Sequence, residues 1–231
     1  VILQTDKNTS GTGSIQTASA IDTNNNNLTI ITSDLALSDT ITTGTADITL
    51  KSSDGRTISI GADTSDSGQF KLSGAELELL YGANLFIGDD STGDMFIEGI
   101  TSTNSANITG KVQLNATGAG KSITFEAADS SFKTLEVFAE DQIMLGSSLS
   151  TTVGDLTLDA DYAGSVDAND KVTIADGVTI TAKEDLILED VRGDYHGAGT
   201  VGLSAGNDLF LKDSLTTVGA LPVNADNDGL S

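Results

Sequence analysis

The chain has 231 residues and a formal net charge of −23, from 34 acidic and 11 basic side chains, and it contains no cysteine. This charge argues against nucleic acids and anionic membrane surfaces as partners, because their phosphate groups would be repelled, and it favours cations. Aromatic side chains make up only 4% and Trp is absent. Such a composition disfavours one thick globular core and favours a thin core made of rows of aliphatic side chains.

No stretch approaches the roughly 20 apolar residues of a membrane-spanning helix, and the first residues, VILQTDKNTS, lack the basic and apolar regions of a secretory signal. We therefore expect no membrane insertion by this segment. A repeat pattern runs nearly to both ends and is least clear in residues 1–27 and 224–231. We expect residues 1–231 to be a single β-solenoid segment, excerpted from a longer repeat protein.

The recurring unit is a pair of short alternating segments whose first apolar residues lie eight positions apart. A one-residue-shorter version comes first in the chain and four ungapped copies follow. The apolar residues are Leu28, Ile30, Leu35 and Leu37, then Leu77, Leu79, Leu85 and Ile87, then Leu135, Val137, Ile143 and Leu145, then Val178, Ile180, Leu186 and Leu188, and finally Val201, Leu203, Leu209 and Leu211. The alternation with Thr, Ser, Glu or Lys, bounded by Gly, Asp, Asn or Ser, predicts β-strands of about three to five residues. No helical stripe is present, so we expect almost no helix.

The spacing between these units indicates stacked coils rather than hairpins. Eleven residues separate Leu37 from Ile48 and also Leu145 from Leu156, and two-residue hairpin turns between longer strands are rare. The 23 residues from Leu186 to Leu209 predict a coil of roughly 20–25 residues in a parallel β-helix. The only proline, Pro222, suits an edge or the last coil.

Three segments carry a resemblance to a known family: ITTGTADITLKSSDGRTISIGAD, TTVGDLTLDADY and DKVTIADGVTITAKEDLILED. They resemble the repeat regions of filamentous-haemagglutinin-like adhesins, which are very large bacterial surface and secreted proteins. The resemblance covers about residues 28–223 and implies a right-handed parallel β-helix. The amino-terminal secretion domain of that family is not among these residues, and the charge is more acidic than a stalk needs.

From the repeat and the resemblance together we expect an all-β protein, a right-handed parallel β-helix (β-solenoid) of roughly ten short-stranded rungs. The expected function is structural and adhesive, as a stalk or filament that is extracellular or on a bacterial cell surface. The expected partners are adjacent repeats of the same chain, further copies placed side by side or end to end, and a glycan or protein surface of a host or the environment.

Parallel β-helices also include polysaccharide lyases and hydrolases, which need converging carboxylates and a basic group. The segment VRGDYHGAG gathers Arg192, Gly193, Asp194, Tyr195 and His196. We expect these five residues to form an exposed insertion between two strands, with no catalytic residue. The alternatives are a carbohydrate-active enzyme, a phage tail-spike-like glycan binder, or receptor binding through the Arg-Gly-Asp tripeptide.

Acidic clusters suggest calcium, the only cofactor indicated by the sequence. In NADNDG, Asn224, Asp226 and Asp228 occupy every second position before Gly229, which is the front half of a calcium-binding loop. The other interpretation of this segment is a solvated turn. The run NNNN at 24–27 allows either an asparagine ladder or an ordinary loop before a strand, and we favour the loop.

Overall fold

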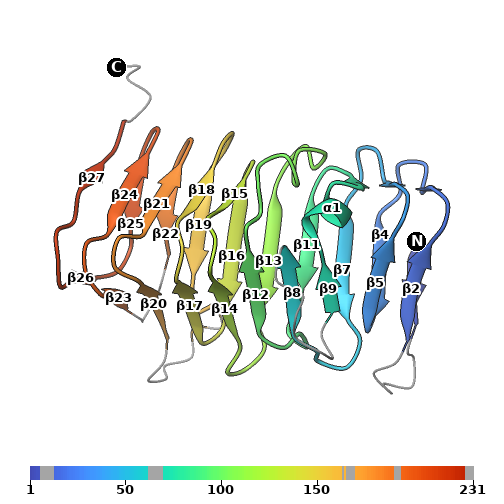
Figure 1. The fold of residues 1–231 in the computed structure, drawn as a ribbon, viewed down its shortest axis with the longest axis horizontal. Helices are drawn as coiled ribbons and strands as arrows, with labels where there is room; N and C mark the ends of the chain where they lie inside the picture. The colour runs from blue at the N-terminus through green and yellow to red at the C-terminus, as the bar shows by residue number, and fades with distance from the viewer. Residues whose placement is uncertain (6–12, 62–69, 163, 165–169, 190–193, 227–231) are drawn as a thin grey trace.

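The computed structural model describes residues 1–5, 13–61, 70–162, 164, 170–189 and 194–226. Short parallel strands are stacked coil upon coil along the long axis of the molecule, from blue at the amino-terminal end to red at the carboxy-terminal end in Figure 1. Within these residues the only helix is α1 (Gly74–Leu77), and no helix is long and apolar enough to span a membrane. The predictions of a parallel β-helix and of almost no helix are confirmed.

Three sheets form most of the wall. The longest contains, in spatial order, β1 (Ile2–Gln4), β4 (Leu28–Thr32), β7 (Ile48–Ser52), β11 (Leu85–Gly88), β13 (Val112–Ala116), β16 (Leu135–Ala139), β19 (Leu156–Asp159), β22 (Leu186–Leu188) and β25 (Leu209–Leu211). The eight-stranded sheet contains β9 (Phe70–Leu72), β8 (Ile58–Gly61), β12 (Met95–Glu98), β14 (Ser122–Phe125), β17 (Gln142–Leu145), β20 (Lys171–Ile174), β23 (Asp194–Gly197) and β26 (Leu215–Thr217). The five-stranded sheet contains β15 (Ser130–Phe132), β18 (Leu149–Thr151), β21 (Thr179–Ala182), β24 (Gly202–Ala205) and β27 (Val223–Asn224).

Two smaller sheets complete the amino-terminal coils. One pairs β2 (Ser14–Thr17) with β5 (Asp34–Leu37), and the other contains β3 (Ile21–Asp22), β6 (Ile41–Thr42) and β10 (Leu80–Tyr81). From β13 onward the chain visits the nine-, eight- and five-stranded sheets in strict turn. Each coil from β13 onward therefore has three faces, and its strands are hydrogen-bonded to strands of the neighbouring coils.

The nine strands of the longest sheet give eight coil-to-coil steps, or about 38 Å at about 4.8 Å per step. The register Leu186↔Leu209 confirms a 23-residue coil, within the predicted range. Other coils are longer, up to the 37 residues from Ile48 to Leu85. That coil carries an extra strand, β9, and α1, so insertions lengthen a coil without breaking the sheet.

The helix α1 corrects one predicted strand, the one that contained Leu77 and Leu79. Ser73 begins a capping box: its hydroxyl accepts from the Glu76 N–H at 3.2 Å, and the Glu76 carboxylate accepts from the Ser73 N–H at 2.9 Å. Glu76 also accepts from the Leu37 N–H of another coil at 3.0 Å. These contacts satisfy the first turn of a helix, and they outweigh the alternating apolar pattern.

The core consists of inward columns of aliphatic side chains that continue from coil to coil. In the nine-stranded sheet one column is Leu28, Ile48, Leu85, Val112, Leu135, Leu156 and Leu186, and the next is Ile30, Leu50, Ile87, Leu114, Val137, Leu158 and Leu188. All of them are at most 2% exposed. Each column residue is covered only when the coils on both sides are present, so stability depends on neighbouring coils.

The repeated unit does not always occupy the same faces. The copy beginning at Leu135 supplies β16 and β17, which belong to the nine- and eight-stranded sheets. The copies beginning at Val178 and Val201 supply one strand of the five-stranded sheet and then one of the nine-stranded sheet, and these two stack directly on each other. The same sequence pattern therefore forms the bend from the nine- to the eight-stranded sheet in one copy, and the bend from the five- to the nine-stranded sheet in two others.

A ladder of side chains precedes the strands of the nine-stranded sheet. The Asp47 N–H donates to Asn27 Oδ1 at 3.1 Å, Asn84 Nδ2 donates to Asp47 Oδ1 at 2.9 Å, and the Lys111 N–H donates to Asn84 Oδ1 at 3.1 Å. We call this column the Asx ladder. The preference for an ordinary loop at residues 24–27 was wrong in this respect, because Asn27 binds the next coil.

The Asx ladder continues in the later coils with aspartates. Asp155 Oδ1 accepts from the Asp185 N–H at 3.0 Å, and Asp185 Oδ1 accepts from the Asp208 N–H at 3.2 Å. Each carboxylate satisfies a backbone donor at the corner of the next coil. The negatively charged carboxylates of Asp155, Asp185 and Asp208 therefore lie one coil apart from each other.

Candidate functional surfaces

The segment at residues 192–196 was predicted to be an exposed insertion between two strands, and this is wrong for Tyr195. Asp194, Tyr195 and His196 belong to β23, which pairs with β20 and β26. Strand alternation turns Tyr195 inward, where it is fully buried and its hydroxyl donates to the Leu158 carbonyl at 3.3 Å. His196 is exposed beside Thr173 and Thr216. Arg192 and Gly193 lie outside the described residues.

The predicted calcium ligands lie at the carboxy-terminal end of the solenoid. Asn224 is in the edge strand β27 and pairs with Ser204, and both Asn224 and Asp226 are exposed. Asp226 has a φ of 63°, and its N–H donates to the Asn207 carbonyl at 3.1 Å. Asp228 lies outside the described residues, among which no three His, Cys, Asp or Glu side chains converge. Calcium binding stays a prediction, which thermal unfolding during a calcium titration can test.

The outer surface of the five-stranded sheet carries a straight row of small polar side chains. The row contains Ser131, Ser150, Thr181, Ser204 and Asn224, which pair in register from coil to coil. Hydroxyl groups on a solvent-facing sheet are ordinary β-sheet surface chemistry. This face is therefore hydrated and free of large apolar side chains along the row.

The outer surface of the nine-stranded sheet differs because it carries aromatic side chains. Phe138 points outward from β16 and contacts Tyr162, with ring centroids 5.2 Å apart and an interplanar angle of 47°. Tyr162 is 54% exposed, and its N–H donates to the Ala139 carbonyl at 3.1 Å. This aromatic pair was not predicted from the sequence. Its only local signal is an aromatic residue at the outward position of LEVFA.

One ion pair on the outer surface of the nine-stranded sheet involves Asp89. Lys51 Nζ lies 3.0 Å from Asp89 Oδ2, and Asp89 Oδ1 accepts from the hydroxyl and the N–H of Ser91 at 2.7 and 2.9 Å. Burial raises the pKa of the Asp89 carboxyl, but the hydrogen bonds from Ser91 and Lys51 and the charge of Lys51 outweigh it. The pKa of Asp89 is therefore below its ordinary value.

The amino-terminal end of the solenoid exposes the interior of the first coil. A cavity of about 700 Å³ opens there, lined by residues 2–5 and 15–21. Leu3, Ile15 and Ile21 pack partly buried against the core, and Ile2 is 69% exposed. Among the described residues, the lining of this cavity therefore combines apolar and polar side chains.

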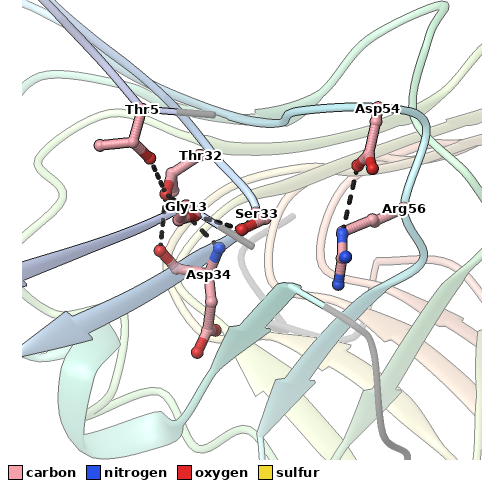
Figure 2. Close-up of polar contacts among 7 residues, drawn as sticks. All are labelled: Thr5, Gly13, Thr32, Ser33, Asp34, Asp54 and Arg56. Carbon is pink, nitrogen blue, oxygen red and sulfur yellow. Dashed lines mark hydrogen bonds and ion pairs between the residues drawn. The ribbon is translucent and has the colours of Figure 1, made fainter. Parts of the chain in front are cut away.

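Hydroxyl groups close one corner of this end, as Figure 2 shows. Thr32 Oγ1 lies 2.8 Å from Thr5 Oγ1 and within hydrogen-bond distance of the carbonyls of Gly13 (3.1 Å) and Asp34 (2.8 Å). The Ser33 hydroxyl also donates to the Gly13 carbonyl. These bonds tie the first coil to the second at the turn between β4 and β5.

A second close contact in Figure 2 holds the corresponding turn of the next coil. Arg56 Nε lies 3.1 Å from Asp54 Oδ1. Asp54 has a φ of 104° and Gly55 a φ of 70°, so this turn uses backbone conformations that few residues other than glycine adopt easily. The ion pair accompanies the sharp bend between β7 and β8.

The carboxy-terminal end also exposes large apolar side chains. Phe210 and Leu211 of β25 are 43% and 42% exposed, and Val223 of β27 is 50% exposed. Pro222 immediately precedes β27, the edge strand of the five-stranded sheet, so the prediction of an edge or last-coil position for Pro222 is confirmed. Both ends of the solenoid therefore combine apolar side chains with the edge strands of sheets.

No protein-family model, curated protein sequence or solved structure matches the chain.

Proposed function

We propose that the chain is a structural and adhesive β-solenoid segment of a large extracellular or cell-surface protein, in which it forms part of a stalk or filament. The observation that carries this proposal is the nine-stranded parallel sheet, in which each strand is hydrogen-bonded to the next from one end of the solenoid to the other. A stack of this kind holds whatever is attached to its two ends at a set separation. The length of the stack sets this separation.

The acidic composition supports the same role. A net charge of −23 keeps the molecule soluble and repels neighbouring rods of the same sign at low ionic strength. Divalent cations would reduce this repulsion and allow rods to approach side by side. The proposal therefore includes an environment, outside the cell, in which such cations are present.

Changing the length of the segment within the native protein tests the proposal. In-frame duplication of residues 1–231 should lengthen the imaged particle by about 40 Å, and replacement by an unrelated β-helix with the same number of coils should preserve attachment to the target surface. Compact particles, or an attachment that survives any change of length but is lost on replacement, would contradict a spacer role.

The aromatic pair Phe138–Tyr162 favours a second candidate function, direct contact with a glycan. An exposed aromatic ring offers a flat apolar face with large contact area and little side-chain entropy to lose, and Tyr162 is the more exposed member of the pair. Tyr162→Ala should then weaken glycan binding about tenfold or more. Tyr81→Ala is the matched control, because Tyr81 is also exposed (40%) but lies on β10. Equal binding by both variants would remove this candidate.

We propose no catalytic role for the chain. Incubation with a panel of acidic and neutral polysaccharides, followed by measurement of new reducing ends or unsaturated products, tests this. Product formation that disappears in Asp194→Ala or His196→Ala would instead establish the carbohydrate-active enzyme that the fold also permits.

A further inference from the structure

We propose that the solenoid bends at one place, the boundary between β5 and β9, and that the carboxylates of Asp34 and Glu76 hold this boundary closed. The inference rests on the proposed spacer function, to which it adds a joint within the spacer. It is argued from the strand pairing, which differs between the faces of the coil that contains β9, and from the hydrogen bonds that cross the boundary.

The strand β9 is an extra layer on one face of the solenoid. It pairs with β8 on one side and lies next to β5 on the other (Figure 1). On this face three steps lead from β5 through β9 and β8 to β12, whereas in the nine-stranded sheet two steps lead from β4 through β7 to β11. At about 4.8 Å per step, the two faces differ in length by about one strand spacing. Regular pairing on both faces would therefore require a tilt of the coils.

The boundary between β5 and β9 takes up this difference, because among the described residues no strand pair joins these two strands. From β13 onward, by contrast, successive coils are joined by paired strands on all three faces. Beside the boundary, β4 and β7 pair over five residues and β6 and β10 over two. The coils before β7 can therefore tilt about the pair β4–β7, which opens the boundary on the side of β5.

Two side-chain carboxylates bridge the boundary in place of backbone pairing. Asp34 Oδ1 accepts from the Lys71 N–H at 3.2 Å, and Glu76 Oε1 accepts from the Leu37 N–H at 3.0 Å. Both carboxylates are carried by side chains with rotatable bonds, so they can follow their donors when the boundary widens slightly. The fixed spacing of paired strands does not allow this.

Apolar side chains keep the boundary closed at rest. Leu35 and Leu37 of β5, and Phe70 and Leu72 of β9, point inward and are at most 8% exposed. Wide opening would bring these side chains into water, which is unfavourable by the hydrophobic effect. The joint therefore opens by a small amount, and the molecule remains one continuous rod.

Distances between pairs of spin labels test the proposal, because the chain contains no cysteine and two labels can be attached at chosen positions. Ala36→Cys with Thr124→Cys places labels on β5 and β14, across the boundary. Thr124→Cys with Thr216→Cys places them on β14 and β26, over the same number of strand steps within the paired sheet. The first pair should show a second population about 5 Å longer than the main one, and the second pair should show a single narrow population.

A third label pair asks whether only one face opens. Thr29→Cys with Gln113→Cys places labels on β4 and β13 of the nine-stranded sheet, which crosses the same coils without interruption. Because this sheet acts as the hinge, the pair should give a single narrow distance. A bend would thus widen one face and leave the other unchanged.

Removal of the two carboxylates should open the boundary further. Asp34→Ala with Glu76→Ala should increase the longer-distance population of the label pair on β5 and β14 about fivefold or more, because two cross-boundary hydrogen bonds are lost. Asp34→Asn with Glu76→Gln keeps oxygen acceptors at both positions and should behave like the unmodified chain. If the double alanine variant does not fold, Asp34→Ala alone replaces it, since it leaves the capping box of α1 intact.

Asp94→Ala is the matched control for the loss of a carboxylate. Asp94 Oδ1 accepts from the Ser122 N–H of the next coil at 3.1 Å, but there β12 and β14 are also paired through their backbones. This variant should therefore leave all three label distances unchanged.

Three outcomes would overturn the proposal. The first is a single narrow distance for the label pair on β5 and β14, both in the unmodified chain and in the double alanine variant. The second is equal broadening of the pair on β4 and β13, which would show general loosening instead of a bend. The third is an equal effect of Asp94→Ala. A rigid boundary would not affect the spacer function, whose test is the dependence of the native particle on segment length.

Discussion

At the scale of single residues, the direction of a side chain in its strand decides what that residue does. Tyr195 and His196 are neighbours in sequence, yet one is fully buried and the other is exposed. Small residues occupy the corners because the chain bends there with little room. Ala139, Ala182 and Ala205 are all at most 1% exposed. Ala139 lies at the end of a strand of the nine-stranded sheet, whereas Ala182 and Ala205 lie at the ends of strands of the five-stranded sheet.

The corner alanines predict a steric effect. Ala139→Leu should lower the free energy of unfolding by about 1–3 kcal/mol, because a larger side chain overpacks a fully buried site closed on one side by Ala116. Urea unfolding measures the loss. Thr181→Leu, at an outward position of β21, should change stability by less than about 0.5 kcal/mol, and an equal loss in both variants would contradict the corner argument.

The lowered pKa of Asp89 predicts that the stability of the fold depends on pH. Its pKa is lowered in the folded chain, so the unfolded chain binds the proton more readily. The stabilisation is present above the unfolded-state pKa of about 4 and is lost as the pH falls through the folded value. Asp89→Asn should therefore cost about 1 kcal/mol at pH 7 and progressively less below about pH 4. Unfolding midpoints of both proteins between pH 3 and 7 measure this, and a constant difference would rule it out.

At the scale of elements, hydrogen bonds from side chains at the corners fix where strands and the helix begin. The capping box of Ser73 and Glu76 makes α1 out of a segment with strand-like alternation. The Asx ladder places one amide or carboxylate oxygen under the backbone of the next coil, as between Asp185 and Asp208. The ladder contacts join residues about one coil apart in sequence, whereas the capping box joins residues three positions apart.

The Asx ladder predicts opposite effects of removing a charge and removing an acceptor. Asp185→Asn keeps the oxygen that accepts from the Asp208 N–H and relieves repulsion from Asp155 and Asp208, so it should be neutral or stabilising. Asp185→Ala leaves that N–H without its acceptor and should cost about 1 kcal/mol. Thermal unfolding at low salt compares the two variants. A larger loss for Asn than for Ala would show that the charge itself stabilises the corner.

At the scale of the whole molecule, the coil is the unit of construction. Core residues contact the coils before and after their own, so coils add or subtract as units provided that register is kept. The 37-residue coil with β9 and α1 shows that extra residues can be accommodated between β8 and β10 while the nine-stranded sheet continues.

Deletion of one whole coil tests this view. Removal of residues 135–155 places Leu156 against Val112, in the column position that Leu135 occupied. The shortened chain should keep its β-sheet circular dichroism and lose about 5 Å of length by small-angle scattering. Removal of residues 135–144 is the matched control, because it shifts the remaining strands onto the wrong faces. That variant should lose cooperative unfolding, and equal behaviour of the two deletions would argue against coils as units.

The alternation of aliphatic and polar residues by itself determined the parallel β-helix, the approximate number and length of the coils, and the edge position of Pro222. Alternation predicts short strands with one buried side, a pattern that a helix does not bury, and the spacing of the units with few two-residue turns between them favours stacked coils over hairpins. It could not assign a strand to one of three faces, since all three use similar strands and similar gaps. The helix α1 has a local signal, the Ser73–Glu76 capping box, but the buried position of Tyr195, the aromatic pair Phe138–Tyr162 and the Asx ladder depend on which coil lies against which. Only the tertiary structure decided these features, because their contacts join residues about 20 to 40 positions apart that the chain brings within hydrogen-bond or van der Waals distance by closing each coil.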